Sequence, residues 1–328
     1  MKERKRVLLG ISATLMTVSL VSCLSLVPLS AAETEEKLRF DILFHGVSHP
    51  FFGPIIKGVE EAGAALGVDA RFIGPAESVS FKEMMDLLEV SIASEPDGIA
   101  IPFLNPTAMD EPIRRAMAKG IPIIAVNVED TRPPEEKIPY LSYIGEPSEL
   151  AGENLARRVL EDFTPKRVLI LVPDPWNIVF TLRHTGIEKV FTEAGVPVEK
   201  LDTGEIPAQV LSTVKSYLIR NPETDLFVGL SQIPANIMDT MIREEGYIGE
   251  KFIATFDFNP KILDSIDEGI TICAMDQQQY LQGFMPVVYL YLYVKYGFLP
   301  PAVVGTGESY IDKETTAVTR EMSELQYR

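Results

Sequence analysis

From Arg39 onward, strand-like and helix-like segments alternate along the chain. The strand-like segments are short apolar runs, and the helix-like segments place apolar residues every three to four positions. This alternation favours an α/β fold with parallel sheets, because parallel strands need a crossover connection that is usually a helix. In the first half of the chain we predict strands at 39–45, 69–73, 98–102, 122–127 and 140–144, and helices at 52–66, 80–94 and 107–119.

A second series of similar length begins at Glu146, so we predict two successive doubly wound units. A long helix follows at 279–296. Its apolar run 284–294 contains Pro286 and is shorter than a membrane span, which favours a buried core helix. For residues 298–328 we predict loop and short strand. The second series has strands at 167–172, 198–204, 226–230, 252–256 and 270–275, and helices at 147–162, 181–194, 208–220, 234–245 and 260–267.

The stretch from Arg39 to Gly67 is the first strand–turn–helix unit. Ligands of doubly wound sheets bind at the carboxyl ends of the strands. Phe51 and Phe52 follow the first strand at this edge, after a polar turn, and two adjacent rings there can form a platform for a small ligand. Ordinary core packing is the alternative interpretation, above all for Phe52.

The amino terminus has the pattern of an export signal, with a basic segment at 2–6 followed by an apolar stretch from Val7 to about Leu20. Two cleavage sites compete. The segment ending in Cys23 fits a lipoprotein, in which that cysteine is lipidated, and the small residues at 30–32 fit ordinary signal peptidase. We favour the second and predict a signal peptide at 1–32. Both interpretations predict an exported, periplasmic or extracytoplasmic protein.

The chain has 328 residues and is 46% hydrophobic and 23% charged, as is usual for a globular protein of about two domains. Removal of 1–32 takes away four of the 30 basic and one of the 47 acidic residues, which leaves a net charge of −20. This charge argues against nucleic acid and anionic membranes as partners. Cys273 is then the one remaining cysteine, so the fold must depend on its core and not on a disulfide.

Four segments together resemble the type I periplasmic binding proteins of the ribose/galactose-binding class, the solute receptors of sugar ABC transporters. The resemblance covers nearly all of 37–328. Repressors of the lactose-repressor type share this fold, but an export signal stands where their DNA-binding segment would be. The four segments are HPFFGPIIKGVEEAGAALGV, PDGIAIPFLNPTAMDEPIRRAMAKGIPIIAVN, RHTGIEKVF and FDFNPKILDSIDEGITICAMDQQQYLQG.

The resemblance implies two Rossmann-like lobes with parallel sheets, joined by a three-strand hinge. We expect the N-terminal lobe to comprise 37–144 plus 277–305 and the C-terminal lobe 145–276 plus 306–328, with crossings near 144–146, 275–278 and 304–307. It also implies a monomer without a cofactor, which binds a monosaccharide or polyol in the cleft between the lobes and delivers it to a membrane permease. A receptor that docks a sensor kinase or chemoreceptor is the alternative function.

A neutral sugar offers hydroxyl groups and flat C–H patches, so its site needs planar polar side chains and aromatic faces. In the first lobe the resemblance implies ligand contacts from Phe51 and Phe52, from His49 and Asn127, and from the weaker candidate Asn105. A solvent-exposed turn histidine and a backbone cap are the alternatives for His49 and Asn127. Val128 stands where ribose binders carry an arginine, so the usual pentose pattern is altered.

In the second lobe the resemblance implies a clamp arginine at Arg183 and an acceptor at Asp257, with Ser231 as a weaker strand-end candidate. A surface helix arginine is the alternative for Arg183. Trp176, the one tryptophan of the chain, either stacks on the ligand or seals the hinge. The family places a glutamine where the strand crosses back, and the sequence leaves the choice between Asp276 and Gln277 open.

The chain carries no nucleophile elbow, phosphate loop or dinucleotide fingerprint. Its three histidines, His45, His49 and His184, do not share one helical face, which makes zinc improbable. Asp257 with Asp276 is the one pair of carboxylates that resembles a hydrolase site, and no other feature supports it. We therefore predict a binding protein and not an enzyme.

Overall fold

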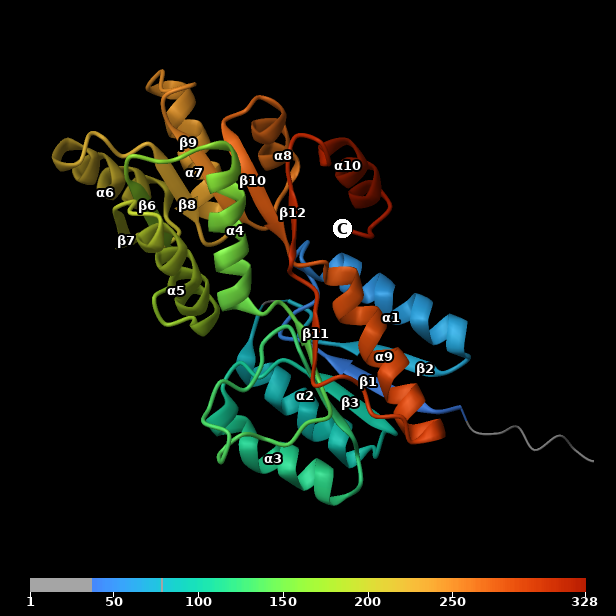
Figure 1. Cartoon of the computed structure of the whole chain (residues 1–328). Helices are drawn as coiled ribbons and strands as arrows, with labels where there is room; N and C mark the ends of the chain where they lie inside the picture. Colours follow the sequence, from blue (N-terminus) through green and yellow to red (C-terminus); the bar gives the residue numbers. More distant parts are fainter. Residues whose placement is uncertain (1–36, 78) are drawn as a thin grey trace, which may run out of the picture. The chain divides into compact units, whose positions relative to one another are not determined.

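The predicted alternation of strands and helices is present in the computed structural model, which describes residues 37–77 and 79–328. Its strands form two six-stranded sheets, each with helices on both faces (Figure 1). The prediction of two α/β lobes with parallel sheets is thereby confirmed. The predicted signal peptide at 1–32 and the candidate lipidation site Cys23 lie outside the described residues.

The first sheet has the strand order β11-β5-β4-β3-β1-β2, and every pair in it is parallel. Helices α1 (Phe52–Leu66) and α9 (Gln279–Tyr296) bury their apolar side chains against one face, and α2 (Phe81–Ala93) and α3 (Pro106–Ala118) against the other. The strands are β1 (Arg39–Leu43), β2 (Asp69–Ile73), β3 (Gly98–Ile101), β4 (Ile123–Val126), β5 (Tyr143–Gly145) and β11 (Val303–Gly305).

The second sheet has the order β12-β10-β9-β8-β6-β7, in which only β12 is antiparallel to its neighbour. Helices α4 (Ser148–Asp162) and α5 (Ile178–Glu193) pack on one face, and α6 (Pro207–Arg220), α7 (Gln232–Glu244) and α8 (Pro260–Asp267) on the other. The strands are β6 (Val168–Val172), β7 (Val198–Asp202), β8 (Leu226–Gly229), β9 (Phe252–Phe256), β10 (Thr271–Asp276) and β12 (Ser309–Ile311).

The chain passes between the sheets three times, after β5, after β10 and between β11 and β12. One buried amide joins the crossings. Gln282 Nε2 donates to Gln277 O and to Thr306 Oγ1, both at 3.1 Å, and its Oε1 accepts from Asn127 Nδ2 at 3.1 Å. Thr306 N in turn donates to Gly145 O at 3.0 Å. We propose that these crossings are the hinge between the two lobes. The lobes then have the predicted limits, 37–144 plus 277–305 and 145–276 plus 306–328, except that the last residues of the chain also contact the first lobe.

The prediction of loop and short strand for 298–328 is wrong in part, because Thr316–Glu324 form the helix α10. The apolar pattern could not reveal this helix, since the residues it buries are Thr316 and Thr319. Helix α5 also begins three residues earlier than predicted, where Asn177 caps it by accepting from Val179 N at 3.0 Å.

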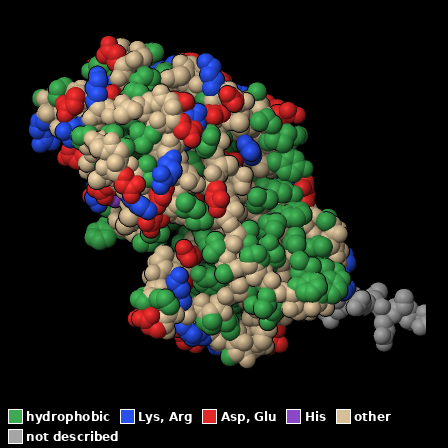
Figure 2. Space-filling view, in the orientation of Figure 1, with side chains coloured by type: hydrophobic (Ala, Val, Ile, Leu, Met, Phe, Trp, Pro, Cys, Tyr) green, Lys and Arg blue, Asp and Glu red, His purple; other side chains and the backbone are tan. Residues whose placement is uncertain are grey.

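Helix α9 is buried along one face and not all round, which corrects the prediction of a buried core helix. Val287 and Leu290 are buried against the first sheet, whereas Tyr289, Tyr291 and Val294 are half-buried and Tyr296, at the end of the helix, is 55% exposed. Figure 2 shows hydrophobic side chains gathered over α9. None of the helices in the described part of the chain is long and apolar enough to cross a membrane.

Paired glycines bring two helices into backbone contact in each lobe. A Cβ on Gly58 of α1 would lie 2.3 Å from Tyr280 O, and one on Gly283 of α9 would lie 2.1 Å from Ile55 O. A Cβ on Gly152 of α4 and one on Gly186 of α5 would likewise lie 2.3 Å and 2.0 Å from backbone oxygens of the partner helix. In the first lobe α9, which follows the crossing after β10, is thus fixed against α1. In the second lobe α4, which follows the crossing after β5, is fixed against α5.

Candidate ligand-binding cleft

A cleft of about 1330 Å³ is lined by residues from both lobes, in the segments that follow the strands. This volume exceeds the roughly 300–1,000 Å³ of ordinary small-molecule pockets, so the lobes would have to approach each other to enclose a monosaccharide. The predicted site residues that line it are His49, Phe51, Phe52, Asn105, Asn127, Trp176, Arg183, Ser231, Asp257 and Gln277. Asp276 is not among the lining residues.

Two lining residues at the carboxyl ends of strands have left-handed backbones. Asn127 follows β4 with φ 61°, and Asp257 follows β9 with φ 60°. Each also donates its backbone N–H to a strand that leads into a crossing, Asn127 to Ile144 O and Asp257 to Met275 O, both at 2.9 Å. Non-glycine residues with positive φ are uncommon and cluster at functional sites, and Asn and Asp tolerate it best. The two lobes therefore present equivalent polar side chains to the cleft.

Arg183 is not a surface helix arginine, because only 2% of the residue is exposed. Its Nε and Nη2 donate to Glu146 Oε1 and Oε2 at 2.8 and 3.0 Å, and its Nη1 donates to Leu230 O at 2.7 Å. The guanidinium also lies 4.1 Å from the centre of the Phe256 ring. Burial raises the pKa of Glu146 above its usual range, and the charge of Arg183 opposes that rise. The pair holds the arginine in a fixed orientation at the wall of the cleft.

Sequence reasoning missed Glu146 and Tyr143. Glu146 lines the cleft, and the Tyr143 hydroxyl beneath it contacts Asn127 O at 2.9 Å and Glu146 O at 2.8 Å. A Cβ on Gly145 would lie 2.4 Å from that hydroxyl, so glycine is required there. Glu146 follows a strand at a predicted crossing, and this position was the one signal that could have identified it.

Gln277 and Asp276 differ in position. Gln277 lines the cleft and donates from Nε2 to Asp257 Oδ1 at 2.7 Å. Asp276 Oδ1 accepts from Gln278 N at 2.9 Å, and its Oδ2 is buried without a hydrogen bond. The structure therefore favours Gln277 for a ligand contact, and Asp276 is placed behind the wall of the cleft, which corrects its inclusion among the contacts.

The aromatic residues differ in how freely they could meet a ligand. Phe52 is 2% exposed and packs edge-on against Phe44, with ring centres 6.0 Å apart, so it belongs mainly to the core. Phe51 is half-buried, and Trp176 is 92% exposed at the far wall. Phe51 and Trp176 are thus the rings available for stacking, from opposite lobes.

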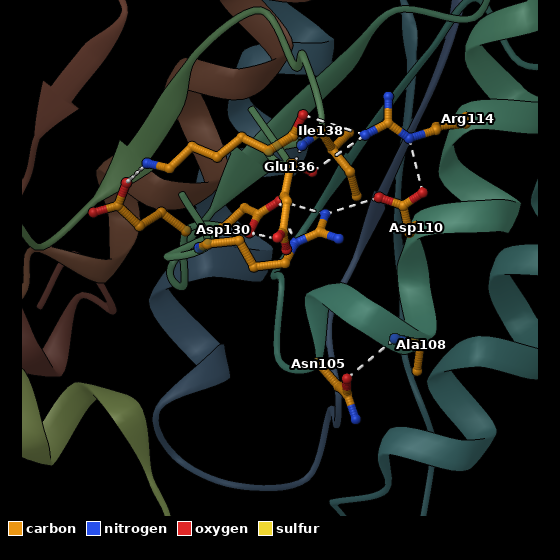
Figure 3. Close-up of polar contacts among 10 residues, drawn as sticks. Asn105, Ala108, Asp110, Arg114, Asp130, Glu136 and Ile138 are labelled. Carbon is orange, nitrogen blue, oxygen red and sulfur yellow. Dashed lines mark hydrogen bonds and ion pairs between the residues drawn. The ribbon is translucent and has the colours of Figure 1, made fainter. Parts of the chain in front are cut away.

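His49 and Asn105 are exposed and take part in local turns. His49 Nδ1 accepts from Phe51 N at 3.1 Å, and Asn105 Oδ1 caps α3 by accepting from Ala108 N at 3.1 Å (Figure 3). Arg132 bridges Asp130 and Asp110 at 2.7 and 2.9 Å and so fixes the loop after Asn127. The Ser231 hydroxyl oxygen is buried without a hydrogen bond and lies on a residue that lines the cleft.

Comparison with known families identifies the fold. The family described as periplasmic binding protein domain matches residues 40–297. The chain is a periplasmic binding protein. It is 26% identical over 280 residues to the xylose/arabinose-binding protein XylF of Sulfolobus acidocaldarius, which covers 81% of this chain and 69% of the relative.

Among solved structures, this periplasmic binding protein resembles a periplasmic sugar-binding protein of Legionella pneumophila, with 28% identity, a TM-score of 0.72, and coverage of 83% of this chain and 100% of the other. It also resembles a carbohydrate transporter of Acidothermus cellulolyticus in complex with myo-inositol, with 26% identity, a TM-score of 0.74, and coverage of 89% and 100%. These similarities confirm the predicted resemblance to type I receptors and support a binding protein over an enzyme.

The charges in the cleft of this periplasmic binding protein favour an uncharged ligand. Six carboxylates line it, from Glu129, Glu146, Asp174, Glu205, Asp257 and Glu324, against three guanidinium groups from Arg183, Arg320 and Arg328. An anionic sugar acid or phosphate would meet net repulsion there. In the described ranges, 37–77 and 79–328, no group of three or more His, Cys, Asp or Glu side chains is arranged to hold a metal ion.

His45 is a second residue of the cleft that was not predicted as a ligand contact. Its Nδ1 is buried without a hydrogen bond, and its ring packs edge-on against Phe52 at 5.3 Å. Burial, with a smaller contribution from His49, lowers the pKa of His45 to about 4. The folded protein therefore keeps this imidazole neutral at pH values where the unfolded chain, with the ordinary pKa of 6.5, binds a proton.

We expect the stabilisation from neutral His45 to be complete above pH 6.5 and to fall by about 3 kcal/mol as the pH is lowered from 6.5 to 4. The measurement is urea unfolding of the wild type and of His45→Gln at pH 7 and pH 4. The variant should lose less stability between the two pH values, because the carboxylates and His184 are common to both proteins. An equal loss would show that His45 does not contribute to the acid sensitivity.

Proposed function

We propose that this protein is an exported receptor that binds a neutral monosaccharide or related polyol in the cleft and delivers it to the permease of an ABC transporter. The observation that carries the proposal is the pair of polar strand ends, Asn127 and Asp257, that face one cleft from two lobes with the same left-handed backbone. A ligand that bonded to both would tie the lobes together and bias the hinge toward closure.

The side chains around this pair suit a sugar. Asp257 has one oxygen engaged by Gln277, and Asn127 has its amide nitrogen engaged by Gln282, so an acceptor oxygen of each can take a sugar hydroxyl. Phe51 and Trp176 offer rings for C–H faces. The relatives named for sugars support this class of ligand, and their description as transporters supports a permease as partner over a sensor kinase.

The direct test is a titration of the purified protein with D-xylose, L-arabinose, D-glucose, D-galactose and myo-inositol. The Trp176 emission and the melting temperature report binding, because the tryptophan lines the cleft and a ligand stabilises the folded state. We expect one of these compounds to give a saturable response. A response to amino acids, purines or small acids alone would retain the fold and reject the sugar.

For the compound that binds, Asp257→Asn should weaken affinity by about 2 kcal/mol, or about thirtyfold, since a charge-assisted hydrogen bond is lost. Asparagine tolerates positive φ, so the melting temperature without ligand should change little. Asp86→Asn, at an exposed position on α2, is the matched control and should bind as the wild type does. Unchanged affinity of Asp257→Asn would remove Asp257 from the site.

A further inference from the structure

The last thirteen residues of the chain, 316–328, lie beyond the part matched by the family, which ends at residue 297. Their helix α10 is attached to α8 of the second lobe. Thr316 Oγ1 donates to Asp267 Oδ1 at 2.6 Å, and Arg320 Nη2 donates to Asp264 and Asp267 at 2.7 and 2.8 Å. These side-chain hydrogen bonds attach α10 to the second lobe.

The residues after α10 are attached to the other lobe. Lys57 Nζ of α1 donates to Leu325 O at 2.6 Å, and the Tyr327 hydroxyl donates to Glu61 Oε1 at 3.2 Å. The Tyr327 ring lies 5.1 Å from the ring of Tyr280 on α9. Lys57 Nζ lies 3.9 Å from the centre of the Tyr327 ring. Figure 1 shows the end of the chain passing from α10 toward α1. The segment therefore joins the two lobes outside the three crossings.

The same segment forms part of the cleft wall, through Arg320, Ser323, Glu324, Gln326 and Arg328. It lies close to the start of α1, since a Cβ on Gly53 would be 2.4 Å from Gln326 Oε1. Arg328 Nε lies 3.5 Å from the buried Asp276 Oδ2, and its Nη1 donates to Thr319 Oγ1 at 3.1 Å. That bond is the one hydrogen bond that Arg328 donates within the described residues, although a guanidinium carries five N–H donors.

We propose that residues 316–328 are a strap that belongs to the ligand site: it restrains opening of the cleft and supplies Arg328 as a donor to the bound sugar. Arg328 brings a guanidinium to the cleft wall beside the strap's contacts with the first lobe. The role of Arg328 as a donor to the sugar rests on the proposed function, whereas the restraint on opening of the cleft does not.

The restraint is tested without ligand by the distance between two spin labels, at Glu135→Cys and Ala208→Cys. Both positions are exposed, and they lie close in sequence to Thr131 and Glu205, which line the cleft from opposite lobes. Cys273 is fully buried, which keeps it from reacting with the label. Ending the chain after Glu324 should lengthen and broaden the distance distribution, because the contacts with Lys57 and Glu61 are lost.

The double variant Lys57→Ala/Tyr327→Phe should shift the distances in the same direction with the whole backbone in place, so a folding defect of the shortened chain does not decide the result. Tyr296→Ala, at an exposed position on α9, is the control and should leave the distances unchanged. Distance distributions identical to the wild type in both the shortened chain and the double variant would overturn the restraint.

The donor is tested with the compound that the wild type binds in the sugar titration. Arg328→Ala should weaken its affinity on the order of tenfold or more, Arg328→Lys should weaken it less, and Arg220→Ala, an exposed arginine of α6, should have no effect. Unchanged affinity of Arg328→Ala would overturn the donor role. Failure of the wild type to bind any of the sugars would reject the proposed function, and the spin-label distances would still decide the strap.

Discussion

Replacement of Glu146 by alanine is expected to lower the free energy of unfolding by about 3–5 kcal/mol, the usual cost of removing one partner from a buried ion pair. Both residues of the pair with Arg183 are 2% exposed, so the variant would leave a guanidinium buried with the Leu230 carbonyl and the Phe256 ring as its remaining partners. Chemical unfolding at pH 7 measures the loss. Ligand affinity should fall with it, because the arginine is no longer held at the cleft wall.

Two further variants separate the ion pair from a general effect of substitution. Glu149→Ala removes an exposed carboxylate in the first turn of α4 and should change stability by less than about 1 kcal/mol. Glu146→Ala/Arg183→Met removes both charges and should cost clearly less than the sum of the two single changes. Strict additivity would contradict the geometry of the pair described above.

Gly152→Ala is expected to destabilise the protein by about 3 kcal/mol, although a glycine-to-alanine change inside a helix normally stabilises it by about 1 kcal/mol. The sign reverses because the new Cβ would lie 2.3 Å from the backbone oxygen of Arg183, and a backbone cannot move aside as a side chain can. Helix α5 must then shift, and Arg183 shifts with it. Thermal unfolding and ligand affinity should therefore both be affected.

Gly63→Ala on α1 provides the comparison, since its Cβ would meet the side-chain Cβ of Ala70 on β2 at 3.0 Å, and the nearest backbone atoms at 3.5 Å. We expect its destabilisation to be much smaller than that of Gly152→Ala. A stabilising or neutral effect of Gly152→Ala would show that α4 and α5 are not held in backbone contact.

Most of the fold could be predicted from the sequence, because the spacing of apolar residues and the turn residues indicate where strands and helices begin and end. The family resemblance, and not a local pattern, predicted that Asn127 and Asp257 contact one ligand, since they follow strands of two different sheets. The sequence could not predict the partners of those residues. Glu146 meets Arg183 from 37 positions away, and Gln282 meets Asn127 from 155 positions away. Such pairs follow from tertiary packing, on which no local pattern reports.

The C-terminal segment was missed for a related reason. Helix α10 buries threonine and not leucine or valine, so the apolar pattern carries no helical period there. The attachment of the chain's last residues to the first lobe depends on Lys57 and Glu61, which stand on the polar face of an amphipathic helix and have no distinguishing feature in the sequence. Leu325 and Tyr327 contact the first lobe, so we propose that 306–328 do not belong wholly to the C-terminal lobe.

We propose that the amide of Gln282 is the pivot of the hinge. It touches the crossing after β10 and the crossing between β11 and β12, and it reaches the crossing after β5 through Thr306 and Gly145. A rotation about such a fulcrum moves groups near it very little and moves groups at the rim in proportion to their distance from it. The lobes can then swing as levers while the bonds at the pivot stay intact, and little of the energy gained from the ligand is spent on deforming the joint.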